Sequence, residues 1–155
     1  MWKSILIFGL SLFFILPVNT HARQADTKML TLEDAKRIAD AAEIRANQDN
    51  WTVVIAVVDE GGHLLLLRRL DGTQIGSVEI AMQKAKTAVF YKRPTKAFQD
   101  GVAAGNVGIL NLPDVLPFEG GIPIMHDGKA IGAIGVSGVT AQQDGIIGQA
   151  GLDAL

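Results

Sequence analysis

The strongest constraint on the fold is a pair of neighbouring segments that are apolar on both of their alternating faces. Residues 52–59 are rich in valine, residues 63–69 contain four consecutive leucines, and Glu60-Gly61-Gly62 between them supplies turn residues. This pattern predicts a β-hairpin. Because both faces of its strands are apolar, neither face can remain in water. Either helices cover both faces or a second subunit covers one of them, and both alternatives remain open at this point.

Helical and extended patterns alternate along the rest of the chain. A helix is expected from Thr31, which can cap the free N–H groups of the first turn, and apolar residues follow it at helical spacing. The further expected elements are a helix from Ser77 to Arg93-Pro94, a short helix from Thr95 to about Val102, a hairpin over 122–136 around Asp127-Gly128, and a helix over 140–152. This order predicts a single α+β domain built on an antiparallel β-sheet packed with α-helices.

Glycine and proline recur throughout residues 105–121, and this segment is predicted to form a long loop. Loops of this length often handle ligands. The second strand of the following hairpin, residues 130–136, contains mostly small residues. These residues allow close approach by another backbone or by a flat ligand, and tight helix packing explains them equally well.

The first 22 residues have the pattern of a secretory signal peptide. Lys3 precedes an apolar run over 5–16, and small residues stand before a cut after Ala22. Such a run spans about 18 Å as a helix, well short of the about 30 Å that a membrane-spanning helix covers, so an uncleaved anchor is the weaker alternative. We therefore expect residues 1–22 to be removed and the domain over 23–155 to be periplasmic or secreted, with no membrane insertion.

Composition excludes several classes of site. The 155 residues include no cysteine, which excludes disulfides, thiolate metal sites and cysteine nucleophiles. The formal net charge of −2 gives no electrostatic footprint for nucleic acid, so no nucleic-acid partner is expected. The chain also lacks a His-Glu-x-x-His motif, a Walker phosphate loop and a Gly-x-Ser-x-Gly elbow. No catalytic residue is predicted from these patterns.

Two histidines remain once the first 22 residues are set aside, and they limit any imidazole chemistry to His63 or His126. His63 begins the second strand of the first hairpin, where alternation places it on the same face as Leu65 and Leu67. It is either a partly exposed histidine beside a turn or a ligand to a metal centre in an apolar cleft. His126 abuts the Asp127-Gly128 turn and is expected to be solvated.

Charged side chains are further candidates for binding. Lys84 flanks the apolar stripe of its helix, so either its stem packs while its ammonium group stays in water, or its charge is aimed at a carboxylate-bearing ligand. Arg69 and Asp71, together with Arg68, form either an ion-pair cluster at the end of the second strand or part of the polar rim of a site.

Five segments of the chain carry a family resemblance. They are 58–64 (VDEGGHL), 69–72 (RLDG), 81–88 (AMQKAKTA), 119–124 (EGGIPI) and 131–138 (IGAIGVSG), with Gln143-Asp144 following. Together they resemble the GlcG/HbpS-like haem-binding (haem-degrading) family, which also includes the C-terminal domain of PduO-type proteins. One departure is Leu70, where the family often has methionine in an Arg-Met-Asp-Gly run; it leaves the fold intact and weakens any role for that side chain.

The resemblance implies a profilin-like domain that usually assembles into a homo-oligomer. It also implies haem or a related tetrapyrrole as ligand, and exported members are linked to haem capture, haem breakdown or redox sensing. A flat macrocycle needs an apolar slot and cationic groups for its propionates, and an axial nitrogen is an optional further ligand. On this basis His63 is predicted to bind the iron, and Lys84 or Arg69 the propionates. The remaining predicted residues of the haem site are Asp71, Gly120 and Gly121.

Three functions are compatible with these patterns. The first, which we expect, is an exported haem-binding protein, with haem degradation or redox sensing as a further role. Degradation would use the oxygen chemistry of the iron itself, with no catalytic residue from the protein. The second is a sensor or accessory module that binds a small organic acid through Lys84 and the glycine-rich loop, without iron. The third is a cofactor-free enzyme that uses Lys84 with Asp71.

Overall fold

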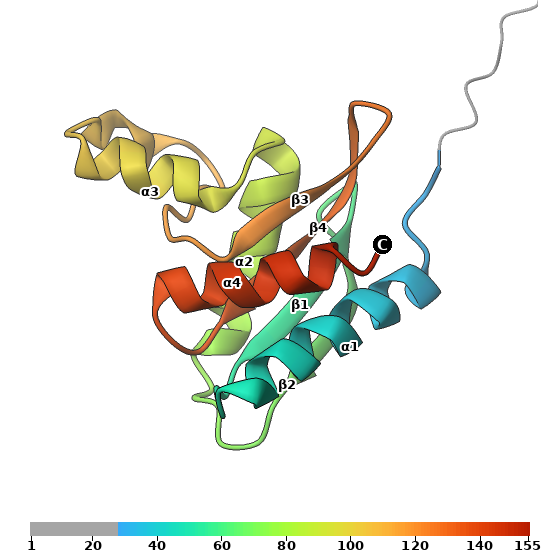
Figure 1. Ribbon diagram of the computed structural model, residues 1–155. Helices are drawn as coiled ribbons and strands as arrows, with labels where there is room; N and C mark the ends of the chain where they lie inside the picture. Colours follow the sequence, from blue (N-terminus) through green and yellow to red (C-terminus); the bar gives the residue numbers. More distant parts are fainter. Residues whose placement is uncertain (1–27) are drawn as a thin grey trace, which may run out of the picture.

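The chain folds into one four-stranded antiparallel sheet enclosed between helices. The computed structural model describes residues 28–155. The elements in chain order are α1 (Leu32–Gln48), β1 (Val54–Asp59), β2 (Leu64–Arg69), α2 (Ser77–Tyr91), α3 (Thr95–Ala103), the 3-10 helix η1 (Val107–Asn111), β3 (Gly121–His126), β4 (Lys129–Ser137) and α4 (Ala141–Leu152). The strands lie in the order β2-β1-β4-β3; α1 and α4 lie side by side on one face, and α2 covers the other (Figure 1). The predicted single α+β domain, with its antiparallel sheet packed with α-helices, is confirmed.

Burial on both faces of β1 explains why helices flank the sheet. Alternate residues from Val53 to Val57 belong to the core that α1 and α4 cover, whereas alternate residues from Val54 to Val58 pack toward α2. Every side chain in this stretch is at most 2% exposed. Of the two alternatives that the sequence left open, the described residues show the first, in which helices cover both faces.

The hairpin of β1 and β2 is the predicted one, but its register is irregular. A bulge between Val57 and Val58 leaves Leu65 as an extra residue on β2. Leu65 therefore packs into the core beneath α1, whereas Leu67 packs toward α2. The prediction that His63, Leu65 and Leu67 share one face is wrong, because the bulge interrupts the alternation on which it rested.

Helix α2 lies directly on the backbone of β3 and β4. A Cβ atom at Gly135 would lie 2.0 Å from the carbonyl oxygen of Ala81, and one at Gly121 would lie 2.3 Å from the carbonyl oxygen of Lys84. The residues that α2 presents to the sheet, including Ala81 and Ala85, are also small. Tight helix packing is one of the two explanations for the small residues of β4, and at Gly135 it is the one that the structure shows.

The second hairpin and the helix caps follow the sequence closely. Asp127 and Gly128 have φ angles of 48° and 76°, as the predicted two-residue turn requires. Thr31 and Thr140 each accept a hydrogen bond from the backbone N–H three residues later, and both complete a capping box. The predicted start of α1 and the predicted boundaries of α2, α3 and α4 are confirmed to within one or two residues.

The loop between η1 and β3 passes over the outer side of α2. The carbonyl oxygen of Asp114 accepts hydrogen bonds from Nε2 of Gln83 at 2.9 Å and from Oγ1 of Thr87 at 2.8 Å. The N–H of Leu116 donates to Oγ1 of Thr87 at 3.0 Å. These bonds fix the loop along α2 and leave the two flanks of the helix accessible on either side of it.

The predicted signal peptide, residues 1–22, lies outside the described residues. The removal of this segment, the start of the domain at residue 23 and export therefore stay predictions. Within residues 28–155, no helix combines the length and the apolar character that crossing a membrane requires.

Replacement of Gly135 by alanine is expected to destabilise the protein. The new methyl group would overlap the backbone of α2, which cannot move away without disturbing the packed face, so we expect a loss of about 1–3 kcal/mol in the free energy of unfolding. Gly76→Ala is the matched control, because a Cβ atom there meets nothing within 4 Å. Urea denaturation of both variants measures the difference; equal stabilities would contradict the close approach of α2.

The cap of α1 is expected to make stability depend on pH under acidic conditions. Hydrogen bonds from the side chain and backbone of Thr31, and then from Arg37, lower the pKa of Asp34 from 3.8 to about 2. The stabilisation from this carboxylate is therefore complete above about pH 4 and is lost as the pH falls toward about 2. Urea denaturation across this range should show a shallower pH slope for Asp34→Asn than for wild type. Asp127→Asn, at a side chain that is 90% exposed, should keep the wild-type slope.

Candidate functional site

A buried ion pair links α2 to α4. Nζ of Lys84 lies 2.7 Å from Oδ2 of Asp144, and each side chain is only 3% exposed. The ammonium group also donates to the carbonyl oxygen of Val136 at 3.0 Å, and Oδ1 of Asp144 accepts from the N–H of Val139 at 3.3 Å. Burial raises the pKa of Asp144, and the charge of Lys84 opposes that rise. Lys84 therefore does not extend into water; it ties α2 to β4 and α4.

Two glycines give the ion pair its space. Gly120 has a φ of 126°, which favours glycine, and a Cβ atom there would lie 2.9 Å from Nζ of Lys84 and 2.6 Å from the carbonyl oxygen of Val136. Gly121 lets the backbone of β3 contact the backbone of α2 at Lys84. The structure thus brings together three of the predicted site residues: Lys84, Gly120 and Gly121.

An apolar cleft of about 250 Å³ lies beside this ion pair, and we call it the lysine cleft. Besides Lys84 and Asp144, its lining residues are Gln74, Ile80, Leu116, Phe118, Ser137, Val139 and Ala141. They come from α2 and the segment before it, from the loop that crosses α2, and from the junction of β4 with α4. The cleft therefore has apolar walls with one charge of each sign among its lining residues.

His63 stands at the turn between β1 and β2, where Asp59 holds the backbone. Oδ1 of Asp59 accepts hydrogen bonds from the N–H groups of Gly61 at 2.9 Å and His63 at 2.8 Å. Nδ1 of His63 lies 3.4 Å from the same oxygen, and the imidazole is 83% exposed. Because Nδ1 lies beside Asp59, Nε2 is the ring nitrogen left for a ligand. His63 thus lies at the surface, not within an apolar cleft.

A shallow slot of about 250 Å³ adjoins this turn, and we call it the histidine slot. Its lining residues include Val58, Gly62, Leu64, Glu79, Met82 and Lys86. Phe90 continues the surface, because a Cβ atom at Gly62 would lie 2.8 Å from its ring. Leu64 and Phe90 are 48% and 41% exposed, and Nζ of Lys86 lies 5.4 Å from the centre of the Phe90 ring. The slot therefore combines exposed apolar surface with one cation, Lys86, and one carboxylate, Glu79. His63 is not among its lining residues and stands beside Gly62 at its edge.

The predicted haem residues do not gather in one place. Lys84 and Lys86 project from α2 about 200° apart, so Lys84 faces the lysine cleft and Lys86 the histidine slot. Arg69 is the last residue of β2, and Asp71 follows it. Six residues of extended chain put Arg69 about 20 Å from His63. There the guanidinium of Arg69 donates to the carbonyl oxygen of Thr73 at 2.6 and 3.0 Å. Lys86 and Phe90, which the sequence reasoning missed, lie nearer to His63.

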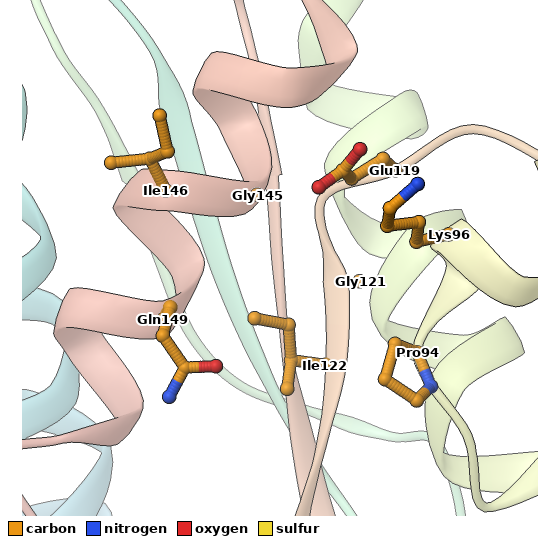
Figure 2. Close-up of a pocket in the computed structure, with 8 residues that line it drawn as sticks. All are labelled: Pro94, Lys96, Glu119, Gly121, Ile122, Gly145, Ile146 and Gln149. Atoms are coloured by element: carbon orange, nitrogen blue, oxygen red, sulfur yellow. The ribbon is translucent and has the colours of Figure 1, made fainter.

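A third depression follows the edge strand β3, between α3 and α4. Figure 2 shows Ile122 at its centre, with Ile146 and Gln149 of α4 on one side and Pro94 and Lys96 on the other. Its volume is about 350 Å³. Of the predicted site residues in the described chain, only Gly121 is among its lining residues.

Comparisons with known proteins agree with this architecture. Residues 30–153 match the family described as "Haem degrading protein HbpS-like". The chain belongs to this family. The match spans all four strands and all four α-helices, so both the histidine slot and the lysine cleft are parts of an HbpS-like domain. The resemblance predicted from the sequence is confirmed.

Individual HbpS-like relatives are similar over most of the domain. Protein GlcG of Escherichia coli is 39% identical over 109 residues, which are 70% of this chain and 81% of GlcG. A crystal structure described as a PduOC:haem complex superposes with a TM-score of 0.75 at 32% identity, covering 83% of this chain and 96% of the other. A double mutant of HbpS from Streptomyces reticuli gives a TM-score of 0.78 at 32% identity, covering 92% of this chain and 98% of the other.

Loss of one member of the buried ion pair is expected to destabilise the domain strongly. Lys84→Met leaves the carboxylate of Asp144 buried without its cation, so the free energy of unfolding should fall by about 3–5 kcal/mol. Lys84→Met combined with Asp144→Leu should recover much of this loss, since an apolar pair of similar volume is often tolerated.

Lys96→Met provides the control for this measurement, because Lys96 and its partner Asp100 are more than half exposed. Urea denaturation should show little change in this variant. If Lys84→Met is as mild as Lys96→Met, the buried pair does not hold α2 to α4.

Proposed function

We propose that this chain is an exported haem-binding protein and that haem binds on the flank of α2 beside His63. The observation that carries the proposal is an accessible imidazole on a fixed turn, next to exposed apolar side chains, in a member of the HbpS-like family. The existence of a PduOC:haem complex in a related domain supports the choice of ligand. Export rests on the signal-peptide pattern over residues 1–22.

The residues around His63 suit the chemical demands of haem. Nε2 would supply the axial nitrogen, while Asp59 holds the backbone of the turn that carries the ring. Leu64 and Phe90 would contact the apolar face of the porphyrin. Nζ of Lys86 lies 3.0 Å from Oδ1 of Asp114, in a pair whose side chains are 37% and 44% exposed. Because this pair is exposed, unlike that of Lys84, Lys86 would exchange Asp114 for a propionate at little cost. When bound, the iron would supply redox and oxygen chemistry, and the protein would supply binding and orientation.

The size of the histidine slot bears on the assembly. Pockets that bury most of a ligand are usually about 300–1,000 Å³. The slot of about 250 Å³ is smaller, so one chain would cover only part of a macrocycle as large as haem. We therefore include in the proposal a homo-oligomer in which a second copy covers the remaining surface of the haem, in line with the oligomer that the family resemblance implies.

The two alternative functions receive less support from the site geometry. Organic-acid binding through Lys84 requires an uncompensated cation, but Asp144 already balances the charge of Lys84. The cofactor-free enzyme requires Lys84 beside Asp71, whereas Asp71 lines a separate polar pocket with Arg69 and Gly72. Haem binding is the function that the observed arrangement favours.

Titration with hemin tests the proposal. The Soret band of hemin should shift and saturate with the chain lacking residues 1–22, and His63→Ala should weaken binding at least about tenfold because the axial nitrogen is lost. His126→Ala is the matched control, since His126 also stands at a hairpin turn beside an aspartate, 3.5 Å from Asp127. Unchanged hemin binding in His63→Ala, or equal losses in both variants, would overturn the assignment of His63.

A further inference from the structure

We propose that the lysine cleft is a second binding site, specific for a small uncharged molecule with a short apolar body and one hydrogen-bonding head, such as a primary amide or an alcohol. This inference concerns the opposite flank of α2 from His63 and does not depend on haem binding. It rests on the hydrogen-bonding capacity of the cleft, on the charge balance of its lining residues and on the shape of its walls.

The cleft retains hydrogen-bonding capacity beyond the ion pair. An ammonium group has three N–H donors, and within residues 28–155 that of Lys84 uses two, toward Val136 and Asp144. Ser137, only 5% exposed, lines the same cleft and has a hydroxyl group that both donates and accepts. A ligand oxygen can therefore accept from Lys84 while a ligand N–H or O–H donates toward Ser137.

The charges of the cleft favour an uncharged ligand. Lys84 and Asp144 sum to zero, and both lie where burial makes an added charge costly. An incoming carboxylate would bring a second negative charge next to Asp144, whose pKa burial already raises. An incoming ammonium group would compete with Lys84 for the same carboxylate. A neutral amide or hydroxyl group avoids both penalties and still fills the remaining hydrogen bonds.

The walls define the rest of the ligand. Ile80, Leu116, Phe118 and Val139 provide apolar surface, and Phe118 is 54% exposed at the opening. The volume of about 250 Å³ is enough for a short aliphatic chain. At the polar end, the ion pair, the hydrogen bond from Lys84 to the carbonyl oxygen of Val136 and that from the N–H of Val139 to Asp144 hold both charged side chains in place. The polar end is thus fixed before a ligand arrives.

Three probes of nearly equal size separate charge from shape: butyramide, butyrate and butylammonium. Each is titrated, without hemin, into the ¹⁵N-labelled chain lacking residues 1–22, and binding is followed by amide chemical shifts. Butyramide should give saturable shifts at Ser137, Val139 and Ala141. Butyrate and butylammonium should bind at least about tenfold more weakly.

Ala141→Leu serves as the blocking variant, because it adds bulk to the wall of the cleft without touching the ion pair. It should abolish the butyramide shifts. Ala97→Leu, at an exposed position on α3, should retain them. Absence of saturable shifts with butyramide, tighter binding of butyrate, or equal binding by Ala141→Leu would each overturn the proposal. None of these outcomes bears on hemin binding, which the Soret titration measures separately.

Discussion

The contact of α2 with Gly121 and Gly135 controls where the candidate binding groups of the domain lie. Because no side chain separates helix from sheet at these two glycines, the backbone of α2 rests there on β3 and β4. Lys84 is then close enough to reach past β4 to Asp144, and Lys86 is turned toward the opposite flank. Side chains in place of these glycines would lift the helix, separate the buried charges and change both clefts at once.

The sequence predicted the elements of the fold wherever a local signal was strong. Thr31, Thr140 and the Asp127-Gly128 turn each act within a few residues, so caps and hairpins could be assigned directly. The bulge beside Val57 has no comparable local signature, and it reversed the expected face of Leu65. Local patterns predict local structure, and register irregularities depend on packing that only the folded chain reveals.

The candidate site was predicted less completely, because its parts are joined over long sequence distances. Lys84 was singled out correctly as unusual, but its partner Asp144 lies 60 residues later and carries no signal that links the two. Arg69 ends β2 and His63 immediately precedes it, so the two are close in sequence, yet the extended strand between them places them far apart. Proximity along the chain was therefore a poor guide to proximity in the site, while the helical projection of Lys86 was readable and overlooked.

The buried ion pair also restricts how this domain can change over evolutionary time. A single substitution at Lys84 or Asp144 leaves one buried charge without its partner, whereas replacement of both residues by apolar ones is tolerated far better. A descendant of this chain that loses the pair must therefore either pass through a poorly folding single-substitution variant or acquire both substitutions together. Positions 84 and 144 are therefore expected to vary together among related sequences. Such joint variation would mark the contact between α2 and α4 even where the rest of the sequence has diverged.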